Sequence, residues 1–169
     1  MEMYNLPPLS AAEFLAACHP DGILSPEQGC HQYGLIVQYE DTDAGGIVYH
    51  AQYLNYAERA RSAFLRAGGI YLGERLRSTG EGIIIRQIDA RYHAPAQLHH
   101  HIIVVTRLEQ LKRASLRLTQ DIISPETGLI FARLLVEGLW VNKKYAPCRF
   151  PDDVQEIITH LLVSEDGAA

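Results

Sequence analysis

One long helical pattern, followed by a run of strand patterns, constrains the fold of this chain more than any other feature. From about residue 50 to residue 67, apolar residues recur at helical spacing on one face, at Tyr53, Ala57, Ala60, Phe64 and Ala67. Most of this stripe is alanine, and such small side chains let a helix lie close to another surface. We therefore expect the helix to pack deep against a sheet and to end at the glycine pair of residues 68–69.

Strand-like segments lie on both sides of this helix. Residues 35–39 predict one strand before it, and the candidates after it are residues 82–92, 102–108, 114–122 and 129–141. A slip of phase near Arg86 predicts a β-bulge in the first of these, and the long apolar last one is expected inside the sheet. The turns between strands are short, which favours antiparallel hairpins. The predicted fold class is α+β, with a five-stranded antiparallel sheet against one long helix.

The chain divides into three parts along its length. Residues 1–30 are expected to form a loosely structured extension, in which the capping-box spacing of Ser10 and Glu13 predicts one short helix. Residues 31–150 form the main domain. Residues 151–169 are expected to form an amphipathic helix and a tail, because Pro151 and two acids favour a helix start. The sequence leaves open whether that helix packs on its own domain or on a partner chain.

Composition narrows the class of protein. The net charge of −5 over 169 residues argues against a nucleic-acid-binding protein. We find no signal-peptide pattern and no apolar run long enough to cross a membrane. The three cysteines, Cys18, Cys30 and Cys148, match no disulfide framework, so we expect a reduced cytoplasmic protein.

Two histidine-containing segments raise the question of a metal site. Cys18, His19, Cys30 and His31 have neighbouring pairs with poor geometry for joint zinc coordination. The consecutive histidines at 99–101 would alternate between the two faces of a strand and so converge poorly on one ion. We predict no metal.

The chemistry concentrates in residues 39–50, directly before the long helix. Acids, a threonine, two glycines and a histidine lie within these twelve residues. Unpaired N–H groups at a helix start can polarise a carbonyl, and the glycines Gly45 and Gly46 let a substrate approach the backbone. Asp43, seven residues before His50, can then attack the polarised carbon or position a water. The same acids are also typical of a helix N-cap, and the glycines of a simple turn.

The segment YEDTDAGGIVYHAQYLNYAERAR, residues 39–61, closely resembles the signature of hotdog-fold acyl-CoA thioesterases. More narrowly, it resembles the YbgC-like branch associated with the Tol–Pal system and related to 4-hydroxybenzoyl-CoA thioesterases. The resemblance covers about residues 33–145. It implies a hotdog fold, in which the antiparallel sheet wraps around the long helix.

The resemblance also implies roles for individual residues. The active-site aspartate of the family falls on Asp43, as nucleophile or general base, with His50 and Tyr39 orienting the reacting groups. Substrate-binding positions are expected in the same segment, at Gly45, Gly46, Val48 and Tyr49. No cofactor is expected, since coenzyme A is part of the substrate. Members form homodimers with sheets joined edge to edge, commonly paired into tetramers, and an acyl carrier protein is a further partner to consider.

Alternatives remain at this point. A non-hydrolytic module that binds acyl-CoA or acyl carrier protein would reuse the same fold, whereas the intact Asp-Thr-Asp-Ala-Gly-Gly run disfavours a hydratase.

The sequence departs from the family after residues 92–96, where histidines 99–101 replace the acids of relatives. Glu58 is expected to pair with Arg61 on the helix surface, and Trp140 to lie in the core. Four basic residues are candidates for CoA phosphates or simply solvated positions, namely Arg86, Arg91, Lys112 and Arg113.

Overall fold

A computed structural model describes residues 3–4 and 8–162 of the chain. Its helices are α1 (Ala11–Ala17), α2 (Gln52–Ala67), α3 (Leu72–Thr79) and α4 (Asp152–Leu162). Its strands are β1 (Ile23–Ser25), β2 (Cys30–Ile36), β3 (Gly82–Tyr92), β4 (His101–Leu111), β5 (Ser115–Ile123) and β6 (Ile130–Val141). No helix among the described residues is both long and apolar enough to cross a membrane.

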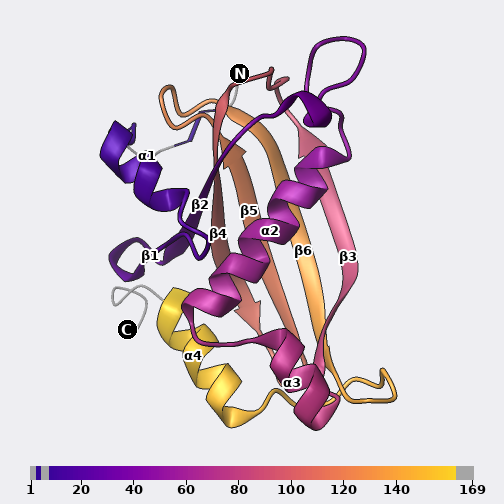
Figure 1. Cartoon of the computed structure of the whole chain (residues 1–169). Helices are drawn as coiled ribbons and strands as arrows, with labels where there is room; N and C mark the ends of the chain where they lie inside the picture. The colour runs from indigo at the N-terminus through magenta and orange to yellow at the C-terminus, as the bar shows by residue number, and fades with distance from the viewer. Residues whose placement is uncertain (1–2, 5–7, 163–169) are drawn as a thin grey trace.

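The strands form one antiparallel sheet in the order β1-β2-β4-β5-β6-β3, and α2 lies across one face of it (Figure 1). Antiparallel hairpins and the interior position of β6 are confirmed. So is the bulge in β3, where the pairing with β6 shifts at Arg86, between Ile85 and Gln87. The sheet has six strands rather than five, because the three-residue β1 pairs with β2. A strand this short shows no alternation that a sequence pattern could reveal.

One local prediction is wrong, and one helix was not predicted. The strand before the long helix spans Cys30–Ile36 instead of residues 35–39, and Tyr39–Asp41 forms a 3-10 turn. The Asp41 carboxylate accepts the Gln38 N–H at 2.8 Å, which ends the extended backbone and stabilises the turn. Helix α3 was not predicted, because it has only eight residues and only two large apolar side chains, Leu72 and Leu76.

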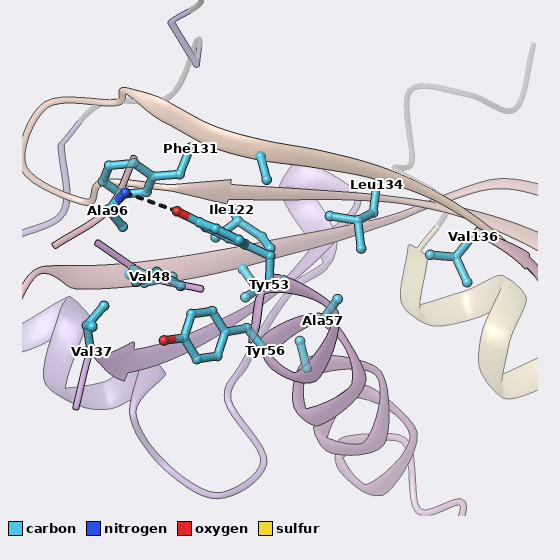
Figure 2. Close-up of a cluster of buried hydrophobic side chains, with 14 residues drawn as sticks. Val37, Val48, Tyr53, Tyr56, Ala57, Ala96, Ile122, Phe131, Leu134 and Val136 are labelled. Atoms are coloured by element: carbon cyan, nitrogen blue, oxygen red, sulfur yellow. Dashed lines mark hydrogen bonds between the residues drawn. The ribbon is translucent and has the colours of Figure 1, made fainter. Parts of the chain in front are cut away.

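The predicted stripe of α2 packs against the sheet. Tyr53, Ala57, Ala60 and Phe64 are buried, as expected, and Ala67 is half-buried. Near the start of the helix, Tyr53, Tyr56 and Ala57 face side chains from β5 and β6 (Figure 2). The Tyr53 hydroxyl accepts the Ala96 N–H at 3.0 Å, so the core also holds the loop that follows β3.

A second part of the core forms at the far end of α2. Phe64 and Leu65 meet Trp140, which is buried as predicted, together with Val154 and Ile158 of α4. Helix α4 therefore packs on its own domain, which resolves the alternative left open by the sequence. Its apolar stripe continues to Leu161 and Leu162, whose side chains lie outside the described residues.

The N-terminal segment is more regular than the loose extension expected for residues 1–30. The predicted capping box is confirmed, since Ser10 and Glu13 cap each other's backbone N–H groups at the start of α1. Phe14 and Ala17 of α1 pack with Ile103 and Val105 of β4. These two strand residues alternate with others that face α2, so α1 covers the opposite face of the sheet.

Candidate functional site

The chain folds back on itself between the 3-10 turn and α2. Thr42 pairs with Val48 as an antiparallel bridge, and the Asp43 N–H donates to the Ile47 carbonyl at 2.9 Å. The tip of this loop is the turn from Asp43 to Gly46, closed by the Gly46 N–H on the Asp43 carbonyl at 3.0 Å. This pairing brings Asp43 alongside the residues that lead into the helix.

A hydrogen bond inside the turn orients the Asp43 side chain. Its Oδ1 accepts the Gly45 N–H at 2.7 Å, while Oδ2 accepts no hydrogen bond from the described residues. Gly46 has a φ of +74°, a conformation that side chains other than glycine rarely adopt. Gly46 thus has a conformational reason to be there, and one carboxylate oxygen of Asp43 is left open to a ligand.

The two acids of the Asp-Thr-Asp run have different environments. Asp41 is only 4% exposed and supports the 3-10 turn through the Gln38 N–H, while its carbonyl accepts the Tyr49 N–H at 2.9 Å. Asp43 is exposed to solvent. Asp41 therefore has a structural role, and Asp43 is the accessible carboxylate.

The helix that follows begins without a side-chain cap. Ala51 occupies the N-cap position, and no side chain caps α2. The acids before the helix therefore do not serve α2 as N-caps; Asp41 caps the preceding turn instead. Within the described chain, the His50 and Ala51 N–H groups donate no backbone hydrogen bond, so both are available to a ligand oxygen.

His50 lies in an aromatic group that joins the helix start to the end of β3. Its ring lies 4.4 Å from the Tyr49 ring, centroid to centroid, and both residues are exposed. The Tyr92 hydroxyl donates to the His50 carbonyl at 3.1 Å. Tyr92 was not among the predicted site residues, and nothing near it in the sequence indicates this contact.

The remaining predicted site residues divide between solvent and core. Tyr39 is 83% exposed on the 3-10 turn and makes no ring contact with the described part of the chain. Gly45 and Gly46 are exposed at the loop tip. Val48 is 3% exposed, and its N–H donates to the Ala96 carbonyl at 2.9 Å. The side chain and N–H of Val48 therefore anchor the loop to the core.

A buried hydroxyl lies beneath the loop. The Tyr56 hydroxyl is enclosed, and the Asp41 carboxylate is its polar neighbour. Burial, together with the neighbouring Asp41 carboxylate, raises the pKa of Tyr56 above its ordinary value. The phenol therefore stays protonated at neutral pH.

Other polar candidates have protein partners. The predicted pair of Glu58 and Arg61 is confirmed at 2.5 Å, and Arg86 pairs with Glu137 at 2.5 Å. In the histidine segment, His101 Nδ1 lies 2.7 Å from the Glu126 carboxylate. Across residues 3–4 and 8–159, no cluster of three or more His, Cys, Asp or Glu side chains is placed to hold a metal ion.

Comparison with known proteins gives a consistent result. Residues 37–158 match the family model of the thioesterase-like superfamily. The acyl-CoA thioester hydrolase YbgC of Escherichia coli is 37% identical over 94 residues, which cover 56% of this chain and 69% of that protein. The acyl-CoA thioesterase YbgC of Haemophilus influenzae is 32% identical over 126 residues, covering 74% and 91%. A solved structure of a probable thioesterase from Bartonella henselae has a TM-score of 0.67 at 30% identity, covering 72% and 99%.

The family match spans the loop, the long helix and most of the sheet, and leaves α1, β1 and β2 outside it. The resemblance seen in residues 39–61 is thereby confirmed, as is the hotdog fold. The chain belongs to the thioesterase-like superfamily, with YbgC proteins among its relatives, and is a thioester hydrolase.

Proposed function

We propose that this enzyme hydrolyses the thioester of an acyl-CoA to a free acid and coenzyme A. The proposal rests on Asp43, an exposed carboxylate held in a tight turn ahead of α2. At the start of that helix, the N–H groups of His50 and Ala51 donate no backbone hydrogen bond within the described chain. Relatives named acyl-CoA thioesterases support the substrate class. Coenzyme A enters as part of the substrate, so the proposal needs no further cofactor.

The geometry suggests how the residues divide the work. The thioester carbonyl oxygen would accept the N–H groups of His50 and Ala51, which makes the carbonyl carbon more electrophilic. Asp43 Oδ2 would then attack that carbon, expelling CoA thiolate, and water would hydrolyse the resulting anhydride. Alternatively, Oδ2 takes a proton from a water that attacks the carbon as the C–S bond breaks. Either route yields the free acid and CoA.

The other predicted residues take supporting roles in this proposal. His50 and Tyr39 would orient Asp43, the water or the thioester, and Gly45, Gly46 and Tyr49 would line the approach of the substrate. All five are exposed around the same loop. Val48 would act as a positioning residue, because its side chain and N–H are occupied by the core.

We also propose that the enzyme is a cytoplasmic homodimer that pairs through the edge of β3. This strand has eleven residues and one unpaired edge, whereas the opposite edge of the sheet is the three-residue β1. The backbone groups along that edge have no partner strand in the described sheet, so they can pair with a second copy. We propose further that two dimers associate into a tetramer. An acyl carrier protein could supply the thioester in place of coenzyme A.

The test is thiol release from a panel of acyl-CoAs by Asp43→Asn. The variant keeps the size of the side chain but is a poor nucleophile and base, so kcat should fall by about 100-fold or more. Glu40→Gln, an exposed acid three residues earlier, is the matched control and should retain activity. Turnover of Asp43→Asn within a few-fold of wild type would exclude the mechanism. Binding of acyl-CoA without any thiol release by the wild type would favour the non-hydrolytic module instead.

A further inference from the structure

A pocket is lined by side chains of α2, α3, β3 and β5. Helix α3 follows the end of α2 that is farther from the Asp43 loop (Figure 1). The lining of the pocket is mostly apolar and includes Leu65, Leu72, Ile83, Ile85 and Leu118. Ile85 is partly exposed at the rim, so the pocket opens to solvent. We call it the α2–β3 pocket.

The polar side chains at this pocket are already paired. Arg61 Nη1 donates to the Gln120 side-chain oxygen at 2.7 Å, and Nη2 donates to the Glu58 carboxylate at 2.5 Å. Gln120 in turn donates to the Ala57 carbonyl at 3.0 Å. A ligand with its own polar groups would have to break these contacts, whereas a hydrocarbon needs only the apolar walls. The chemistry of the lining therefore favours a hydrocarbon.

An apolar stripe connects the pocket to the Asp43 end of the helix. Ile83 and Ile85 of β3 lie in the pocket, and the same strand ends at Tyr92, which holds the His50 carbonyl. Between them, Ile88 and Ala90 are half-buried at the margin of the core. The stripe lies on the inner face, because its members pair with core residues of β6, among them Val136, Leu134 and Ala132. Helix α2 packs closely on β1, β2, β4 and β5 but not on β3, which leaves this strip of β3 beside it.

The distance along this stripe sets the size of the ligand. From His50 the chain advances eight residues to Glu58 and fifteen to Leu65, the first and last residues of α2 that line the pocket. At about 1.5 Å per helical residue, these spans correspond to about 12 Å and about 22 Å. A short or single-ring acyl group with its thioester at the loop would not reach the pocket, whereas a long alkyl chain would.

Building on the proposed function, we propose that the α2–β3 pocket binds the distal end of a long-chain acyl group. The thioester of that group lies at Asp43, and its methylenes follow Ile88 and Ala90 along β3. The enzyme is then selective for long-chain fatty acyl thioesters over short or aromatic ones.

Two neighbouring isoleucines allow a matched test. Ile85→Trp places an indole at the pocket, whereas Ile84→Trp makes the same change on the opposite face of the same strand, at similar exposure. Each variant and the wild type are assayed for kcat/KM on butanoyl-, octanoyl-, dodecanoyl-, palmitoyl- and benzoyl-CoA. Calorimetry measures binding of hexadecyl-CoA thioether, which cannot be hydrolysed. Light scattering checks that all three proteins have the same mass.

The wild type should prefer the longer chains. In Ile85→Trp, kcat/KM on palmitoyl-CoA and affinity for the thioether should fall about tenfold or more, the scale on which pockets discriminate hydrocarbon groups, with butanoyl-CoA within about twofold. Ile84→Trp should follow the wild type. The proposal is overturned if butanoyl- or benzoyl-CoA is the best substrate, if Ile85→Trp lowers all substrates equally, or if it only changes the mass. If no acyl-CoA is hydrolysed but Ile85→Trp still weakens binding of the thioether, the proposed reaction is wrong and the proposed acyl-binding pocket is supported.

Discussion

The Tyr92 hydroxyl donates a hydrogen bond to the His50 carbonyl at 3.1 Å, which ties the last residue of β3 to the residue that leads into α2. The Tyr92 ring also packs against the Tyr53 ring, with centroids 5.6 Å apart. An edge strand and the helix start are thereby held together at the proposed carbonyl-binding N–H groups. The contact joins residues 42 positions apart in the chain.

We predict that Tyr92→Phe keeps the ring packing but loosens the helix start. A hydrogen bond of this kind contributes about 1 kcal/mol net, so kcat should fall about fivefold if its whole effect acts on the transition state. The thermal midpoint should change little. Steady-state kinetics on one acyl-CoA checks this, with Tyr145→Phe as the exposed control. Unchanged kcat in Tyr92→Phe would show that the tie has no role in catalysis.

The two loop glycines should respond differently to alanine. Gly46 has φ +74° and open space around its missing Cβ, so Gly46→Ala should cost about 1 kcal/mol of stability through backbone strain. At Gly45 a Cβ would lie 3.0 Å from Asp43 Oδ1, the oxygen that the turn holds. Gly45→Ala should therefore lower kcat more than it lowers stability. Urea unfolding and thiol-release kinetics on both variants separate these effects; equal behaviour of the two would contradict the assigned role of the Asp43 turn.

Buried His31 predicts a pH dependence of stability. Its Nε2–H donates to the Asp21 carbonyl at 2.7 Å, and its Nδ1 has no partner among the described residues. Burial lowers the pKa of His31, partly opposed by that hydrogen bond and by the Asp21 carboxylate, while Arg66 adds to the lowering. The unfolded chain, with a pKa of about 6.5, then takes up the proton first as the pH falls. The free energy of unfolding should therefore decrease as the pH drops below about 6.5 and level off below the folded pKa.

This slope is measured by urea unfolding from pH 5 to pH 8. His31→Phe should remove much of the slope, since it deletes the titrating ring, whereas the exposed His19→Gln should retain it. A wild-type curve that is flat below neutral pH would contradict the prediction.

The N-terminal helix should contribute to stability without taking part in the reaction. Phe14 is 7% exposed and packs on the sheet face away from α2, so Phe14→Ala should cost about 3 kcal/mol or more. Leu15 is 71% exposed and should tolerate alanine. Activity well below the unfolding temperature should be unchanged in both variants. A large loss of kcat in folded Phe14→Ala would instead link α1 to the site.

The sequence determined the regular elements with a clear repeat and the chemistry of one local segment. Helix α2, the bulge in β3 and the hairpins were predictable, because periodicity and turn residues report local conformation. The Asp43 turn could be predicted from the sequence for the same reason, since its hydrogen bonds join residues a few positions apart. By contrast, β1, with three residues, and α3, with eight, are too short to show a recognisable repeat.

Only the tertiary structure decided which residues of the site are buried and which are exposed. It buried Asp41 and Val48, exposed Asp43, and brought Tyr92 from the far end of β3 to His50. It also placed α3 and β3 beside α2 to form the α2–β3 pocket. These relationships depend on which strand pairs with which and on how α2 crosses the sheet. A one-dimensional pattern does not contain that information, because the same alternation fits several strand orders.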